Sequence, residues 1–490
     1  MAASFTEIWL NWSIEIIVLF GICYIILIYL FNWFLKYSTT DIIYLCIYLF
    51  LIMLYVLFRA DAFEGTHYIS NNYFIYNEFY NFVKKFIVIC MICYLILLNN
   101  FNNIMKLPIF EYLILIFSCL FGILMIIRSN HLFVIFLFLE LVNLCLYCLI
   151  GLNKDSNMGI ESAYKYFVQS SLATIIGFFG ISLIYMSTGT LFLNELSLLV
   201  TFNDLNFLSI VGIYLVITSV FFKLGIFPLH SWIAEVYQGT LLISLVFIAL
   251  LPKIAYVILF LKLYIEFNTL IHNYCLILSG ISVIYGSLIS LYQTSFRRLL
   301  AYGSMVHIGL MIFSISLYTT QTVTAGIFYL FSYILLMLFT FCFMFFLFEK
   351  DSNEKLYYLD DISKFHLYFS NNIILTTFFV LIIFSLAGLP FFIGFIAKWY
   401  IFISLIDVFN IFEVLIFLSI SVLSSSYYIR ILRFIYFSMK HNKIKRYSII
   451  KFDNLFYNLI FILLVINVLT IVYHNMIFLM IFKKILLLFF

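Results

Sequence analysis

Apolar segments long enough to cross a lipid bilayer recur along the whole chain, separated by short polar links. One crossing takes about 20 apolar residues, and in hydrocarbon only a helix satisfies its own backbone hydrogen bonds over that length. A transmembrane β-barrel would instead show alternating strands of about ten residues, and the sequence lacks that pattern. We therefore expect an all-α membrane protein with about 14 transmembrane helices. Their approximate ranges are 12–35, 42–58, 82–98, 109–127, 131–152, 163–187, a broken seventh over 207–238, 241–265, 271–292, 298–318, 323–348, a broken twelfth over 372–406, 411–437 and 456–483.

The seventh and twelfth helices are expected to be broken because Pro228 and Pro390 interrupt their apolar segments. A proline removes a backbone hydrogen bond and clashes with the preceding turn, at about 3 kcal/mol, and the neighbouring Gly225 and Gly388 ease unwinding. Paired broken helices are typical of inverted-repeat transporters, although two ordinary proline kinks remain the alternative. The expected domains are an N-terminal three-helix segment (1–108), two inverted five-helix repeats (109–265 and 266–440) and a C-terminal helix (441–490).

Composition and charge agree with a membrane protein. The 490 residues are 66% hydrophobic and 10% charged, whereas soluble domains are about half apolar and about a quarter charged. The net charge of +4 is small and does not favour a nucleic-acid partner. Arg297, Arg298 and the basic stretch 430–446 lie on one side by helix parity, and the opposite links are acidic. The positive-inside rule places the basic side in the cytoplasm or matrix.

Four charged residues, Glu140, Lys223, Lys253 and Lys398, fall deep inside apolar segments. A charge near the bilayer centre costs about 2.5 to 3.5 kcal/mol on insertion scales, so such residues usually face a bundle interior or a water path and serve ions or protons. Lys253 lies about 18 Å from either end of its helix, too far for its side chain to reach the membrane surface. Desolvation favours the neutral amine, so Lys253 is expected to accept and release protons near neutral pH. A permanently neutral lysine or a fixed ion pair is the structural alternative.

Glu140 and Lys223 are expected to form an ion pair. If Glu140 holds Lys223 protonated, displacement of that partner would release the proton, which is a usable pump step. A static pair that fixes helix register is the alternative. Lys398 stands next to Trp399, so an interfacial aromatic belt with a snorkelling lysine competes with a role in proton transfer.

His230 and His307 are candidate relays between these lysines because imidazole titrates near neutral pH. Each is equally well explained as a satisfied core histidine. Lys165 and Lys262 lie nearer helix ends, where snorkelling to the interface explains them more simply.

Metal, nucleotide and hydrolytic chemistry find no support in the sequence. The cysteine pairs Cys90–Cys93 and Cys145–Cys148 have helical spacing in apolar segments, and core packing explains them better than a metal site, which would want about four ligands. The chain contains no Walker loop, no GxGxxG after a strand, no HExxH and no GxSxG. Redox or nucleotide chemistry would therefore come from partners.

Five stretches carry a resemblance to a known family. They are SAYKYFVQSSLATIIGFFGISLIYMSTGTLFLNEL (162–196), KLGIFPLHSWIAEVYQGT (223–240), SLYQTSFRRLLAYGSMVHIGLMI (290–312), AGLPFFIGFIAKWYIF (387–402) and SSSYYIR (424–430). Together they resemble the antiporter-like subunits of respiratory complex I, subunit 2 in particular. Lysine at position 398 favours subunit 2 over subunit 4, whose counterpart there is glutamate. The chain departs from the family in QGTLLIS, which lacks the usual prolines, and in the links 59–81 and 349–370, which we expect to bind accessory subunits.

The resemblance implies a proton-translocating subunit of NADH:ubiquinone reductase without a redox centre of its own. Glu140 and Lys223 would be the ion pair, Lys253 the central relay and Lys398 the terminal proton carrier. The chain would bind no cofactor, with NADH, FMN, iron–sulfur clusters and ubiquinone in partner subunits. Its partners would be other membrane-arm subunits, including neighbouring antiporter-like ones, and lipids.

The expected location is the mitochondrial inner membrane. The start MAASFTEIW has neither a secretory signal pattern nor the Arg-rich pattern of a transit peptide. The 61 phenylalanines and 37 tyrosines fit an A/T-rich organelle genome. Two rival functions remain: an Mrp-type cation/proton antiporter subunit, and a structural spacer of the membrane arm in which the charges are fixed.

Overall fold

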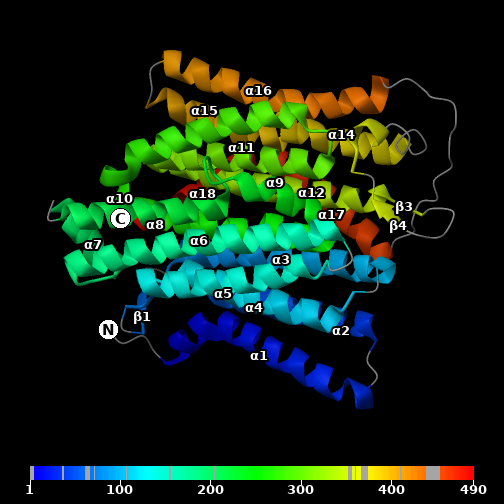
Figure 1. Cartoon of the computed structure of the whole chain (residues 1–490), viewed down its shortest axis with the longest axis horizontal. Helices are drawn as coiled ribbons and strands as arrows, with labels where there is room; N and C mark the ends of the chain where they lie inside the picture. Colours follow the sequence, from blue (N-terminus) through cyan, green and yellow to red (C-terminus); the bar gives the residue numbers. More distant parts are fainter. Residues whose placement is uncertain are drawn as a thin grey trace. The chain divides into compact units, whose positions relative to one another are not determined.

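Helices make up almost all of the chain, as Figure 1 shows for the computed structural model. The structure describes residues 5–35, 38–60, 67–70, 72–105, 107–153, 156–202, 205–350, 356–358, 360–365, 373–408, 411–437 and 453–489. Within these ranges there are 17 α-helices, and 10 spans are long and apolar enough to cross a membrane. The expected all-α membrane architecture is confirmed.

The chain forms two compact units, each assembled from separate segments. The first unit contains Met1–Leu224, Gly239–His272 and Lys483–Phe490, and the second contains Gly225–Gln238 and Asn273–Phe482. The two expected inverted repeats, with boundaries at 109–265 and 266–440, stay a prediction.

In the first unit, neighbouring helices pack side by side from α3 to α6 (Figure 1). Where α6 packs on α8, Gly180 and Gly212 bring the two backbones together, and a Cβ built on either glycine would lie 2.7 Å from the carbonyl oxygen of the other. Small residues commonly serve such close helix contacts in membranes. The elements are α1 (Phe5–Leu35), α2 (Thr39–Ala60), the antiparallel strands β1 (His67–Ile69) and β2 (Phe74–Tyr76), α3 (Glu78–Met105), α4 (Ile109–Arg128), α5 (Leu132–Gly151), α6 (Asn157–Thr188), α7 (Leu193–Thr201), α8 (Phe207–Leu224) and the first part of α10 (Leu242–Tyr292).

In the second unit, α12 is buried over nearly its whole length. It packs on α11, α14, α15 and α17. The elements are most of α9 (Ser231–Gly239), the rest of α10, α11 (Phe296–Ser316), α12 (Thr320–Met344), η1 (Phe345–Leu347), the antiparallel strands β3 (Phe348–Lys350) and β4 (Leu356–Tyr358), η2 (Ile362–Lys364), α14 (Ile373–Ala387), α15 (Ile393–Ile406), α16 (Ile411–Phe437), α17 (Asn454–Val472) and the first part of α18 (His474–Phe489).

Both expected helix breaks are confirmed. α8 ends at Leu224 and α9 begins at Ser231, while α14 ends at Ala387 and α15 begins at Ile393. The residue after each ended helix is a glycine with positive φ, 73° at Gly225 and 79° at Gly388. Other residues rarely adopt this conformation, so glycine fixes the point at which each helix stops.

Three features of the helices were not expected. The last expected helix, 456–483, is divided at Tyr473 into α17 and α18. The short helix α7 was not expected. The two expected helices 241–265 and 271–292 are present, joined within α10 at Phe267, whose φ of −119° and ψ of 16° are non-helical.

Candidate functional site

The three lysines that the sequence places deep in the membrane are all buried. Lys223 and Lys253 are 3% exposed and Lys398 is 5% exposed. None of them snorkels, so the interfacial interpretation of Lys398 is wrong, although its neighbour Trp399 is 52% exposed. A buried lysine in a membrane helix must be solvated by protein groups or by internal water.

In the first unit, Lys223 and Glu140 are linked through a third side chain. Lys223 Nζ donates to Asn143 Oδ1 at 2.9 Å, and Asn143 Nδ2 donates to Glu140 Oε2 at 3.0 Å. Among the described residues, no ion pair within 4.0 Å joins Glu140 directly to Lys223. The expected ion pair is therefore an interaction bridged by an amide, with all three groups in one hydrogen-bonded row.

Asn143 is the site residue that the sequence reasoning missed. It is fully buried and lies three residues after Glu140 on α5, so both side chains leave the same face of the helix. That spacing was a usable signal, because an asparagine beside an intramembrane glutamate needs a polar partner of its own.

Lys253 lies within the first part of α10, and Pro252 directly precedes it. Pro252 has no N–H and leaves the carbonyl one turn earlier, at Ile248, without its helical donor. The sequence reasoning overlooked this proline. Each of the three buried lysines therefore lies close along the chain to a proline, Pro228 for Lys223, Pro252 for Lys253 and Pro390 for Lys398.

In the second unit, Lys398 of α15 reaches back to the break in its own broken helix. Its Nζ donates to the Ala387 carbonyl at 3.1 Å and to Ser424 Oγ at 3.3 Å. A Cβ built at Gly388 would lie 3.0 Å from Lys398 Nζ, so a larger residue there would displace the ammonium by a few tenths of an ångström. The Ala387 carbonyl at the end of α14 has no helical donor, and it accepts a hydrogen bond from Lys398 instead.

His307 lies between two tyrosine hydroxyls. Its Nδ1 is 2.6 Å from Tyr329 Oη, and its Nε2 is 3.0 Å from Tyr428 Oη. Tyr428 follows the Lys398 ligand Ser424 by four residues on α16. The two side chains therefore lie on the same face, about 6 Å apart along the axis. α16 thus provides one hydroxyl to Lys398 and, one turn further on, one hydroxyl to His307.

His230 is half-buried in the segment between α8 and α9. Its ring packs against Tyr285, with ring centroids 4.6 Å apart, and stacks on Phe227 at 5.7 Å. Among the described residues, no hydrogen bond or ring contact joins it to Lys398 or His307. Its expected relay role stays a prediction.

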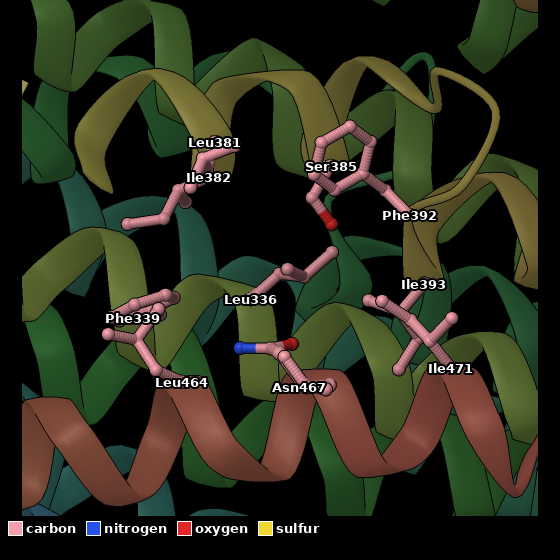
Figure 2. A pocket seen from close by; sticks show the side chains of 11 residues that line it. Leu336, Phe339, Leu381, Ile382, Ser385, Phe392, Ile393, Leu464, Asn467 and Ile471 are labelled. Atoms are coloured by element: carbon pink, nitrogen blue, oxygen red, sulfur yellow. The ribbon is translucent and has the colours of Figure 1, made fainter. Parts of the chain in front are cut away.

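A cavity of about 100 Å³ lies beside the break between α14 and α15. Its wall is apolar apart from Ser385 and Asn467, whose hydroxyl and amide are directed into it from opposite sides in Figure 2. Ser385 Oγ and Asn467 Oδ1 have no hydrogen-bond partner among the described residues. A cavity of this volume has room for a few waters close to the start of α15.

Metal ligands do not gather anywhere in the described part of the chain, where no group of three or more His, Cys, Asp or Glu side chains is placed to hold an ion. Cys90 and Cys145 are buried as single thiols. Cys145 Sγ lies 3.1 Å from Ser118 Oγ.

Broken helices whose ends meet buried lysines, in a bundle of apolar helices, define a class of membrane proteins that move ions or protons through an internal polar path. A model of the family described as NADH:quinone oxidoreductase/Mrp antiporter, TM, matches residues 129–424. The chain belongs to this family.

Two bacterial proteins are similar to this chain over most of its length. The chain is 31% identical over 371 residues to the NADH-quinone oxidoreductase subunit N of Pelagibacter ubique, covering 75% of this chain and 77% of the relative. It is 28% identical over 445 residues to subunit N of Rickettsia typhi, covering 88% and 92%. Within the family, the chain is thus an antiporter-like subunit of the subunit N type.

Solved structures share the fold. A chain of respiratory complex I from Thermus thermophilus superposes with a TM-score of 0.77 at 18% identity, covering 95% of this chain and 98% of that one. A chain of the Mrp complex from Dietzia superposes with a TM-score of 0.79 at 15% identity, covering 97% of each.

Proposed function

We propose that this chain is a proton-translocating membrane subunit of respiratory complex I, coupling NADH-to-ubiquinone electron transfer in partner subunits to proton pumping. Its membership of the antiporter family and its similarity to bacterial subunit N support this proposal. The observation that carries it is the burial of Lys223, Lys253 and Lys398 in apolar helices, with Lys223 and Lys398 beside helix breaks.

In the first unit, we assign proton loading to the row Glu140, Asn143 and Lys223, with Lys253 as the central relay. The Asn143 amide donates to the carboxylate and accepts from the ammonium, which stabilises both charges together. When the charge on either group changes, the other loses part of its stabilisation. A proton is then released from Lys223.

In the second unit, we assign the terminal step to Lys398. Its Nζ has a carbonyl and a hydroxyl as ligands and no carboxylate within 4.0 Å among the described residues, so its charge is not fixed by an ion pair. In this proposal, Ser424 and Tyr428, which lie one turn apart on α16, form a polar row from Lys398 to His307. His230, at the α8 break, is the further candidate relay.

The driving energy must come from outside the chain. Each proton moved against 100 mV costs about 2.3 kcal/mol, which buried lysines alone do not supply. In this proposal the chain binds no cofactor. NADH, FMN, the iron–sulfur clusters and ubiquinone belong to partner subunits of the membrane complex.

We place the protein in the mitochondrial inner membrane, as an organelle-encoded subunit. The abundance of phenylalanine and tyrosine supports an A/T-rich coding genome. The relatives named above are bacterial, so their location does not distinguish a bacterial from a mitochondrial membrane.

An Mrp-type cation/proton antiporter is the second candidate, favoured by the fold shared with the Dietzia Mrp complex. Co-purification with redox subunits separates the two functions, because only a complex I subunit remains bound to them. A structural spacer is the third candidate, and it predicts that the buried lysines carry no exchangeable proton.

The test is Lys253→Met in the whole complex, reconstituted in proteoliposomes. We expect the complex to assemble and the number of protons pumped per NADH oxidised to fall severalfold, because methionine fills the same space without a titratable group. Lys165→Met is the matched control, since Lys165 is 37% exposed and paired with Glu161 on the surface of α6. An unchanged proton-to-NADH ratio in Lys253→Met would support the spacer.

A further inference from the structure

Four charged side chains outside the proposed route are buried together in the first unit. Glu15 of α1 pairs with Lys84 of α3 and, at 3.1 Å, with Arg128 at the end of α4. Lys262 of α10 contacts the same end of α4, and all four residues are at most 4% exposed. Lys262 therefore does not snorkel, contrary to the expectation from its place near a helix end. Below, these four residues are called the α4-end cluster.

Lys262 is held by neutral groups. Its Nζ donates to the carbonyls of Ile127 at 2.7 Å and Ser129 at 2.8 Å, and it lies 4.7 Å from the centre of the Tyr80 ring. These carbonyls lie at the C-terminus of α4, where helix carbonyls lack helical donors and the helix dipole favours a cation. No carboxylate lies within 4.0 Å of Lys262 in the described part of the chain.

This geometry suits both protonation states of Lys262. An ammonium has three N–H donors, and a neutral amine still has two, which is the number of carbonyl acceptors present. Loss of a proton therefore breaks neither hydrogen bond. Lys398 has the same kind of surroundings, with a helix-end carbonyl and a hydroxyl as its ligands. A static ion pair, by contrast, is disrupted when one partner becomes neutral.

The charges of the cluster do not balance when all groups are ionised. Three cations, Lys84, Arg128 and Lys262, face the single carboxylate Glu15. The next carboxylate on α10 is the half-buried Glu266, which interacts with Ser197 of α7 as well as with Lys262. Even with it counted, one positive charge is in excess. Arginine does not deprotonate in proteins and Lys84 is paired, so Lys262 is the group that gives up the excess charge most easily.

We infer that the α4-end cluster is a second proton-exchanging site, in which Lys262 gains and loses one proton while Glu15, Lys84 and Arg128 keep their charges. The inference rests on the proposed function, because it adds a site to a proton-translocating subunit. In the exchange, the ammonium gives one proton to water and becomes an amine, and uptake of one proton from water reverses the step.

The cluster has an access route at the end of α4. Asn130 binds the β1–β2 hairpin through its N–H to the Tyr73 carbonyl at 2.8 Å, and its own carbonyl accepts from the N–H of Leu193 in α7 at 3.0 Å. The next residue, His131, precedes α5 and is partly exposed. Its Nδ1 has no hydrogen-bond partner among the described residues.

We take His131 as the entrance to the cluster, because it is partly exposed and Lys262 binds the carbonyl only two residues before it. Its ring forms a triangle with those of Tyr73, at 5.1 Å, and Phe192, at 4.8 Å, and the latter two are 5.1 Å apart. Burial lowers the pKa of His131, and the Glu195 carboxylate of α7 partly opposes this shift. The surrounding helices carry further charged groups besides the cluster: Lys85 and Glu78 of α3, Glu111 of α4, Glu195 of α7, Glu266 of α10 and Lys484 of α18.

This site is separate from Lys253, although both lysines belong to α10. They are nine residues apart (262 − 253), which is about two and a half helical turns, so they project from opposite sides of the helix. Lys262 faces α3 and α4, which lie outside the row of Glu140, Asn143 and Lys223.

The experiment uses two variants of Lys262 that keep its hydrogen bonds and remove its proton exchange. Lys262→Arg is always charged, and Lys262→Gln is always neutral but has two N–H donors for the two carbonyls. In the reconstituted complex we expect both variants to assemble. We expect each to pump at most about half as many protons per NADH oxidised as the wild type. Lys165→Arg is the control and should match wild type. A normal ratio in Lys262→Arg or in Lys262→Gln would overturn the inference.

A second variant does not disturb the buried cluster. His131→Gln removes the titratable group at the partly exposed entrance, and we expect the pH profile of pumping to change while quinone reduction is retained. An unchanged profile would contradict the access route. Lys253→Met is measured beside these variants: lost pumping there with normal pumping in both Lys262 variants overturns only the second site, whereas normal pumping in all of them overturns the proposed function itself.

Discussion

Asn143 has no titratable proton, and it is hydrogen-bonded to two side chains that do, Lys223 and Glu140. Replacement by leucine would leave the buried Lys223 ammonium and the Glu140 carboxylate without their hydrogen bonds, at about 1–3 kcal/mol for each unsatisfied group. We expect Asn143→Leu to lower both the thermal stability of the complex and the proton-to-NADH ratio. Both are measured on the purified, reconstituted complex.

Asn143→Asp distinguishes coupling from simple packing. The aspartate has the same shape, and it would place a carboxylate at the 2.9 Å position that now holds the amide oxygen. A direct ion pair would fix Lys223 in its charged form. The second aspartate oxygen would replace the Nδ2 donor that now lies 3.0 Å from Glu140 Oε2, so the two carboxylates would have to share a proton. Pumping should be lost with quinone reduction retained, whereas wild-type pumping in Asn143→Asp would mean that the amide has no role in coupling.

At this scale, sequence identified the titratable residues but not their partners. Glu140, Lys223, Lys253 and Lys398 were found because a charge in an apolar run is conspicuous. Asn143 was missed because an uncharged polar residue in such a run has many structural explanations, and its partner lies 80 residues away along the chain. Contacts of that separation are set by helix packing, which single-sequence patterns do not specify.

Among the elements, α16 is expected to connect two titratable groups. Tyr428→Phe and Ser424→Ala remove one hydroxyl each from His307 and Lys398 and leave the packing almost intact. We expect each variant to lower the proton-to-NADH ratio, and the double variant to lower it no more than the worse single one, because both hydroxyls serve one row. Ser425→Ala is the control, since the Ser425 hydroxyl is exposed and bonds to its own helix at Val422. Fully additive losses would argue against a shared row.

The break between α14 and α15 gives a further prediction. Gly388→Ala strains a backbone with φ of 79° and pushes a methyl group toward Lys398 Nζ, whereas Gly189→Ala strains a φ of 74° with nothing within 4 Å of the new Cβ. Both should cost about 1–2 kcal/mol of stability from the backbone alone. Only Gly388→Ala should also impair proton pumping in the reconstituted complex. Equal pumping by the two variants would show that the position of Lys398 at the break is unimportant.

Sequence predicted these elements well wherever proline and glycine punctuate an apolar run. The breaks at Gly225 and Gly388 follow from local chemistry alone. The division at Tyr473 and the short helix α7 carry no such signal, because tertiary packing decides whether an apolar segment continues or turns. Pro252 shows the converse, since α10 continues through it.

For the whole molecule, composition and segment length were enough to predict a helical membrane protein. The boundaries of the two compact units were not predictable in the same way. The segment Gly225–Gln238 belongs to the second unit although the chain on either side of it belongs to the first. Sequence patterns assign neighbouring residues to one domain. In this fold, a short segment belongs to a different compact unit from the residues that flank it in the chain.

The amide between Glu140 and Lys223 has a consequence for the efficiency of the complex. If the two groups touched, the direct ion pair would fix both of them in their charged forms, and the electrostatic energy delivered by redox chemistry could not release the proton of Lys223. An asparagine transmits the field of one group to the other and passes no proton. Under the proposed function, the 2.9 Å and 3.0 Å contacts of Asn143 therefore limit slip and allow the delivered energy to be recovered as work against the membrane potential.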